Sequence, residues 1–163
     1  MYRKIEDQLN KWKNDYKMPL MLVGARQTGK TYILEEFCKN NFNNYIYINL
    51  DKEENICEVF ENSIDPKVII EKIEIIKNVI INPEDTVIFF DEIQEVKDWE
   101  KCINSFRVSL DCDIYITGSN ANLLSGELAT YLGGRYVEFV IYPFSFNEFT
   151  ELYHSITPDA SIQ

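Results

Sequence analysis

Gly24-Ala-Arg-Gln-Thr-Gly29-Lys30-Thr31 is the stretch of sequence that decides the fold. It follows a short apolar run, Leu20–Val23, and leads into a helix-like segment that begins at Thr31. A glycine-rich loop between a strand and a helix curls tightly and turns several backbone N–H groups toward a polyphosphate. The start of the helix adds further N–H donors, so the pattern predicts a binding site for a nucleoside triphosphate.

The side chains of this loop have expected roles of their own. Lys30 supplies a point charge for the β and γ phosphates, and Thr31 supplies a hydroxyl for Mg²⁺. Arg26 and Gln27 are expected to project outward, and Arg26 fits a phosphate contact or a structural ion pair equally well. The expected nucleotide-binding residues are Gly24, Ala25, Arg26, Gln27, Thr28, Gly29, Lys30, Thr31 and Tyr32.

An acidic pair, Asp91-Glu92, is the expected second half of the site. It follows the apolar run Thr86–Phe90, which is typical of a strand buried on both faces of a parallel sheet. Open α/β sheets bind ligands at the carboxyl ends of their strands, where Asp91 would lie. We expect Asp91 to hold Mg²⁺, usually through water, and Glu92 to deprotonate a water that attacks the γ-phosphate.

Length and charge limit the other functions that the chain can have. Its 163 residues are enough for one sizeable core, and 45% hydrophobic and 26% charged residues are ordinary for a soluble globular protein. The net charge of −11 disfavours direct binding of nucleic acid by this domain, because such affinity is built on cationic neutralisation.

The remaining composition predicts a cytoplasmic protein. The four cysteines form no C-x-x-C pair and have no histidine cluster nearby, so we expect reduced thiols and no zinc site. We find no signal peptide and no apolar run long enough to span a membrane, so we expect no membrane partner.

Alternating strands and helices predict an α/β sandwich with a mostly parallel sheet. The expected helices cover residues 2–15, 30–39, 53–62, 98–109 and 121–132, and the expected strands cover 20–23, 45–50, 86–90, 113–117 and 136–141. Asp65-Pro66 is expected to cap a further helix that carries Ile69, Ile73, Ile76 and Ile80 on one stripe and ends at Pro83. Its β-branched content leaves a strand as an alternative. Ser145-Phe-Asn-Glu148 predicts a capping box for a last short helix.

Together, these motifs resemble the AAA+ superfamily of ATPases, and in particular prokaryotic AAA-type ATPases. The Walker A motif is Gly24 to Thr31 and the Walker B motif is Asp91-Glu92-Ile93-Gln94. The resemblance extends over about residues 2–152. Its further matches are Tyr47–Asp51, Ile116–Asn120, Leu132–Arg135 and Tyr142–Phe149.

The resemblance implies a P-loop NTPase three-layer sandwich with a five-stranded parallel sheet in the order 5-1-4-3-2. It implies that Asn120 is the first sensor of the γ-phosphate, with Ser119 as the runner-up, although Asn120 also fits a helix cap. It places Arg135 where relatives present an arginine finger to a neighbouring subunit, with a surface arginine or an ion pair as the alternative. Relatives continue into a helical lid, which we expect to be absent here.

The leading functional hypothesis is an Mg²⁺-dependent ATPase core that serves as a switch or motor part of a larger protein. Residues 1–152 would form the core, and 153–163 a tail or the start of a lid. The alternative is a nucleotide-binding scaffold that mediates protein–protein interaction without turnover, and a small-molecule phosphotransferase is a third hypothesis. Self-association or a protein partner is expected, and the sequence holds no Asn-Lys-x-Asp motif for guanine.

Overall fold

Five parallel strands form one central sheet. The computed structural model describes residues 3–15, 18–82, 85–110, 112–119 and 134–157. The strands are β1 (Leu20–Gly24), β2 (Asn44–Asn49), β3 (Thr86–Asp91), β4 (Asp113–Gly118) and β5 (Val137–Ile141). Their order is β2-β3-β4-β1-β5, with every neighbouring pair parallel. Counted from the other edge this is 5-1-4-3-2, so the predicted fold class is confirmed.

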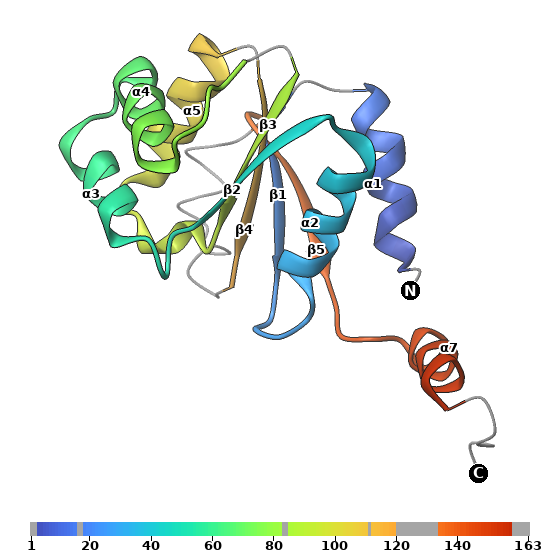
Figure 1. The fold of residues 1–163 in the computed structure, drawn as a ribbon. Helices are drawn as coiled ribbons and strands as arrows, with labels where there is room; N and C mark the ends of the chain where they lie inside the picture. Colours follow the sequence, from blue (N-terminus) through green and yellow to red (C-terminus); the bar gives the residue numbers. More distant parts are fainter. Residues whose placement is uncertain (1–2, 16–17, 83–84, 111, 120–133, 158–163) are drawn as a thin grey trace.

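Helices cover both faces of the sheet (Figure 1). α1 (Lys4–Asp15) and α2 (Lys30–Asn41) lie on one face, and α3 (Glu54–Asn62), α4 (Pro66–Lys77) and α5 (Trp99–Ser109) lie on the other. Successive residues of a strand point to opposite faces, and β1 therefore contributes to two cores. Leu20 and Leu22 belong to the core under α1 and α2, whereas Met21 and Val23 belong to the core under α3, α4 and α5.

The register of the strands brings two chain segments to one edge of the sheet. All six residues of β3 are buried, because β2 and β4 flank this strand and helices cover both of its faces. β3 ends at Asp91, which is paired in register with Asn49 at the end of β2. β1 ends at Gly24, and the preceding residue, Val23, is paired with Gly118 of β4. The phosphate loop and the acidic pair therefore both start from the carboxyl edge of the sheet.

The helix expected after Asp65-Pro66 forms, but it is shorter than predicted. The Asp65 side chain accepts a hydrogen bond from the Lys67 N–H, and Pro66 is the first helical residue. α4 ends at Lys77 because Asn78 takes a left-handed conformation with φ of 52° and donates its N–H back to the last turn. The expected end at Pro83 is wrong, and Ile80 lies beyond the helix with 90% of its surface exposed.

The last helix, α7 (Phe146–Ile156), begins with the predicted capping box. The Ser145 hydroxyl accepts from the Glu148 N–H, and the Glu148 carboxylate accepts from the Ser145 N–H. The helix expected over 121–132 lies outside the described residues. Among the helices that are described, none is long and apolar enough to cross a membrane.

We predict that Gly24→Ala destabilises the fold, because β1 and β5 approach closely at this position. A Cβ on Gly24 would lie 2.3 Å from the carbonyl oxygen of Ile141, so the strand ends would have to separate. The expected loss is about 1–3 kcal/mol in the free energy of unfolding, measured by chemical denaturation. Ala25→Ser, at the exposed next residue, is the matched control. Equal stability of the Gly24→Ala and wild-type chains would contradict this close approach.

Candidate nucleotide-binding site

The loop between β1 and α2 is held in a tight curl by its own atoms. Gln27 and Gly29 have positive φ values of 63° and 87°. Gly29 adopts this conformation without a steric penalty and precedes the first residue of α2. The Thr28 hydroxyl donates to the Ala25 carbonyl oxygen at 2.9 Å, which closes the turn. Such a curl directs backbone N–H groups toward one side, which is the arrangement that an anion requires.

The Lys30 side chain lies across this loop and is buried. Its Nζ donates to the carbonyl oxygens of Gly24 at 3.0 Å and Ala25 at 2.7 Å. Burial lowers the pKa of Lys30 from its ordinary value of 10.5, while the carboxylates of Glu92 and Asp91 oppose this shift. The ammonium group is therefore bound to the loop backbone, and the charges of the acidic pair act on it.

Asp91 joins the loop to three strands of the sheet. Its carboxylate accepts hydrogen bonds from the Thr31 hydroxyl at 2.9 Å and from the Tyr47 hydroxyl at 2.8 Å. The Asn49 amide at 3.3 Å and the Thr117 hydroxyl also donate to it. Thr31 lies in the first turn of α2, Tyr47 and Asn49 come from β2, and Thr117 comes from β4. Burial, together with the hydrogen bond to Asp91, raises the pKa of Tyr47, so this phenol stays a donor.

Glu92 is held in a separate network one residue farther on. Its backbone is left-handed, with φ of 58°, and its N–H donates to the Thr117 hydroxyl at 3.1 Å. Its Oε2 accepts from the Ser119 hydroxyl at 2.8 Å and from the Gln94 side-chain amide at 2.6 Å. Gln94 belongs to a short 3-10 helix, η1 (Ile93–Glu95), and Ser119 follows β4. The carboxylate is therefore fixed by two side chains from different segments.

The structure brings together most of the residues expected at the site. Lys30, Thr31, Asp91, Glu92 and Ser119 meet at the carboxyl edge of the sheet, through the contacts given above. Asn120 lies outside the described residues.

The other expected residues lie at the rim of this site or away from it. Arg26 and Gln27 are exposed, as predicted, and within the described part of the chain no ion pair is found for Arg26. Tyr32 is 58% exposed and lines a cleft between α1 and α2. Arg135 precedes β5, whose first residue, Val137, pairs with Leu20 at the start of β1. Arg135 is thus exposed at the amino edge, opposite the phosphate loop.

Four further residues contact the acidic pair, and sequence reasoning placed them in family motifs without giving them a role. Tyr47, Asn49 and Thr117 surround Asp91, and Gln94 holds Glu92. A signal was present, because Tyr47, Asn49 and Thr117 are polar residues near the carboxyl ends of otherwise apolar strands. Which carboxylate each would contact depends on the strand order, which spacing along the chain does not reveal.

The oxygen atoms at this edge fit a magnesium ion that is bound together with a nucleotide. Mg²⁺ takes hard oxygen ligands and is bound by one or two protein groups plus substrate phosphates and waters. The Thr31 hydroxyl and the Asp91 carboxylate provide such oxygens 2.9 Å apart. In the described ranges, no group of three or more His, Cys, Asp or Glu residues could hold a metal by itself. The donor set therefore suits a shared ion and not an all-protein metal cage.

A family model described as an AAA domain matches residues 16–150, which include the phosphate loop and the acidic pair. The chain belongs to the AAA domain family. It is thus a nucleotide-binding AAA module, in agreement with the resemblance to the AAA+ superfamily.

Two curated relatives share part of this chain, and each of them is several times longer than the shared part. An uncharacterized protein of Haemophilus influenzae is 70% identical over 59 residues, which are 36% of this chain and 15% of that protein. The uncharacterized protein MJ1544 of Methanocaldococcus jannaschii is 35% identical over 130 residues, which are 79% of this chain and 27% of that protein. The structure of C. elegans PCH-2 aligns with a TM-score of 0.49 and 14% identity, covering 94% of this chain and 43% of that one.

We predict that Asp91→Ala destabilises the AAA domain even without nucleotide. The hydroxyls of Thr117 and Tyr47 would lose an acceptor at a site where Asp91 itself is only 2% exposed. Unpaired donors of this kind cost about 1–3 kcal/mol, which chemical denaturation would measure. Asp51→Ala, an exposed acid after β2, should change stability little and is the control. If both variants unfold like the wild type, Asp91 does not organise the strand ends.

Proposed function

We propose that the chain binds ATP with Mg²⁺ and hydrolyses it, as the AAA-type core of a larger protein. The observation that carries this proposal is the hydrogen bond of 2.9 Å between the Thr31 hydroxyl and the Asp91 carboxylate. It joins two motifs that lie 60 residues apart in the sequence, in the relation that MgATP binding requires. The buried ammonium of Lys30 lies within the electrostatic reach of both acids.

The loop residues Gly24 to Tyr32 would bind the triphosphate. Backbone N–H groups of the loop and of the start of α2 face the anion, and Lys30 exchanges its bonds to loop carbonyls for bonds to the β and γ phosphates. Thr31 and Asp91 would hold Mg²⁺, which supplies charge neutralisation at the phosphates when it is bound. Adenine is preferred by family membership, and the sequence lacks the Asn-Lys-x-Asp motif for guanine.

Glu92 would act as the general base for hydrolysis. It orients a water toward the γ-phosphorus and takes its proton as the oxygen–phosphorus bond forms and the bond to the β-phosphate oxygen breaks. Ser119 contacts Glu92 directly, which supports it as the runner-up to Asn120 for the role of γ-phosphate sensor. Arg135, exposed at the opposite edge of the sheet, cannot reach the site in its own chain, so its role as a finger requires a second subunit.

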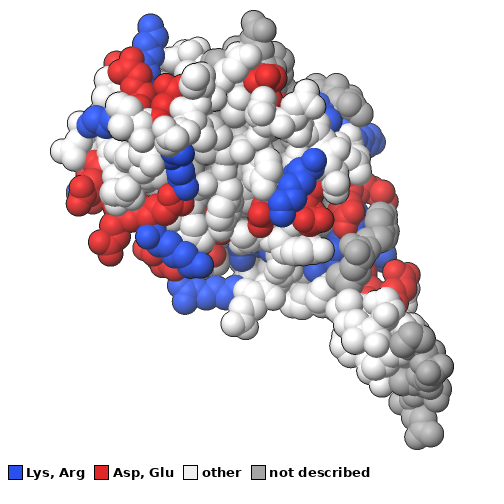
Figure 2. Space-filling model, viewed as in Figure 1, with Lys and Arg blue, Asp and Glu red and all other residues white. Residues whose placement is uncertain are grey.

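The larger context of the domain is also a proposal. The chain spans 15% and 27% of the length of the two curated relatives that it matches. We propose that residues 1–152 form the catalytic core, that 153–163 are a tail or the start of a lid, and that self-association or a protein partner completes the active assembly. Lys and Arg side chains are interspersed with Asp and Glu side chains on the face seen in Figure 2. Together with the net charge of −11, this favours a protein partner over direct contact with nucleic acid.

One observation favours the alternative of a nucleotide-binding scaffold without turnover. Ser119 and Gln94 both donate to Oε2 of Glu92, at 2.8 and 2.6 Å, and hold the carboxylate that would act as the base. A base that keeps both bonds when nucleotide is present would accept a proton poorly. The scaffold alternative therefore predicts binding of MgATP with no release of phosphate.

We predict that Lys30→Ala abolishes nucleotide binding. Removing the ammonium group deletes charge-assisted hydrogen bonds to two phosphates, so the dissociation constant should rise by at least about 100-fold. Calorimetric titration with ATP, ADP and GTP, with and without Mg²⁺, measures this change. Lys39→Ala is the control, because Lys39 lies on the same helix and pairs only with the nearby Glu35 and Glu36 among the described residues. Tight MgATP binding by Lys30→Ala would refute the proposed phosphate site.

We predict that Glu92→Gln keeps MgATP binding and stops hydrolysis. Loss of the base should lower the turnover number by roughly 100-fold or more, measured as phosphate release over a range of protein concentrations. Glu54→Gln, an exposed acid on α3, is the control. Equal hydrolysis by Glu92→Gln and the wild type would remove Glu92 as the base, and binding without phosphate release at any concentration would favour the scaffold. Activity per molecule that rises with concentration, and is lost in Arg135→Ala, would support a finger in trans.

A further inference from the structure

α7 buries few of its side chains against the rest of the molecule. Of its eleven residues, all of which are described, Glu148 alone is buried. The aromatic side chains of Phe146 and Phe149 are 73% and 49% exposed. Figure 1 shows this helix projecting from the body of the domain. Leu152 and Tyr153 are only partly buried, so apolar burial of α7 is slight and the contacts of the Glu148 carboxylate are an important part of its attachment.

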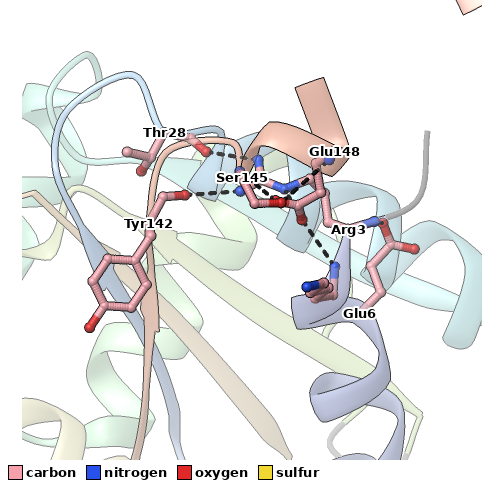
Figure 3. A network of polar contacts seen from close by, with 7 residues as sticks. Arg3, Glu6, Thr28, Tyr142, Ser145 and Glu148 are labelled. Atoms are coloured by element: carbon pink, nitrogen blue, oxygen red, sulfur yellow. Dashed lines mark hydrogen bonds and ion pairs between the residues drawn. The ribbon is translucent and has the colours of Figure 1, made fainter. Parts of the chain in front are cut away.

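Four hydrogen bonds saturate the Glu148 carboxylate (Figure 3). Oε1 accepts from the Arg3 Nε at 3.1 Å and from the Lys4 N–H at 3.2 Å. Oε2 accepts from the N–H and the hydroxyl of Ser145, both at 2.9 Å. Burial raises the pKa of Glu148, but the bonds from Ser145 and Lys4 and the charge of Arg3 outweigh it and lower the pKa to about 2. The carboxylate is therefore ionised at neutral pH.

Arg3 connects this carboxylate to the phosphate loop. Its side chain is 7% exposed, and its guanidinium lies 4.2 Å from the centre of the Phe144 ring. Besides the bond from Nε to Glu148, one terminal nitrogen donates to the Thr28 carbonyl oxygen at 3.4 Å and the other to the Tyr142 carbonyl oxygen at 2.9 Å. The planar fork of an arginine reaches three acceptors in fixed directions, which a lysine cannot do.

The contact with Thr28 favours one direction of a backbone N–H group in the loop. The peptide between Thr28 and Gly29 is trans, as are all the described peptides, so its C=O and N–H point in opposite directions. When the Thr28 C=O faces Arg3, the Gly29 N–H faces the other side of the loop. Arg3 thus supports the phosphate loop from the side away from the expected anion. Two other carbonyl groups of this loop accept hydrogen bonds from within it: Gly24 from Lys30, and Ala25 from the Thr28 hydroxyl.

We propose that Arg3 is a positioning residue of the phosphate loop and that the Arg3–Glu148 pair couples nucleotide binding at the loop to the docking of α7. This rests on the proposed function, since it requires the loop to bind a nucleotide. Each side of such a coupling affects the other equally: a docked α7 tightens nucleotide binding, and a bound nucleotide holds α7 more firmly. A change at the phosphates is thereby transmitted to the exposed aromatic side chains of α7.

The test compares Arg3→Lys and Glu148→Gln with the wild type and with Glu151→Gln, an exposed acid one turn farther along α7. MgATP affinity is measured by calorimetry, and amide hydrogen exchange of α7 is measured with and without saturating MgATP. We expect the dissociation constant to rise about tenfold or more in Arg3→Lys and Glu148→Gln, because a hydrogen bond to a charged group is lost. MgATP should slow exchange in α7 of the wild type and Glu151→Gln, but not in the other two variants.

The outcomes separate this proposal from the proposed function. Equal affinities in all four proteins would overturn the coupling, and so would a wild-type α7 whose exchange is unchanged by bound MgATP. The second result needs no variant, so it decides the matter even if Arg3→Lys or Glu148→Gln fails to fold. Failure of the wild type to bind MgATP would refute the proposed function, and the coupling with it. Loss of thermal stability alone, with normal affinity and a normal response of α7, would show that the pair is merely structural.

Discussion

The site depends on one buried carboxylate. Asp91 accepts hydrogen bonds from side chains of β2, β4 and the start of α2, and it ends a strand that is buried on both faces. A charged oxygen in such a position is tolerated only when donors surround it. The need to surround Asp91 with donors fixes the relative positions of the strand ends and the first turn of α2. The same contacts that make the carboxylate acceptable in the core thus arrange the oxygens that suit a magnesium ion.

The parallel sheet explains why these groups meet. All five strands end at one edge, so the residues that follow an apolar run converge there whatever their separation in the sequence. The order of strands places β4 between β3 and β1, which brings Thr117 and Ser119 to the acidic pair. Arg135 precedes a strand and does not follow one, so it lies at the opposite edge. Position relative to a strand, more than residue type, decides which polar residue belongs to the site.

Local sequence predicted the elements of the fold well, and it predicted long-range contacts poorly. The apolar run before Asp91 and the loop after Val23 identified the strands, because buried parallel strands are continuous apolar segments. The end of α4 was misplaced, since Asn78 ends the helix through a left-handed backbone before Pro83 is reached. The contacts of Tyr47 with Asp91 and of Arg3 with Glu148 join residues 44 and 145 positions apart. The periodicity of apolar residues along the sequence does not predict such pairs, because they depend on how the strands are arranged in the sheet.

Backbone conformation separates the site from the rest of the chain. Four non-glycine residues have positive φ among those described: Gln27, Asn78, Glu92 and Asp98. Asn and Asp tolerate the left-handed region because their short polar side chains bond locally, whereas Gln and Glu gain less and pay roughly 1–2 kcal/mol. The two costly cases are the two that lie in the phosphate loop and the acidic pair. At Glu92 the N–H bond to Thr117 and the side-chain bonds to Ser119 and Gln94 offset the cost. Such strain persists where surrounding contacts hold the backbone in place. Here it accompanies a carboxylate at the end of a buried strand whose charge acts on Lys30 of the phosphate loop.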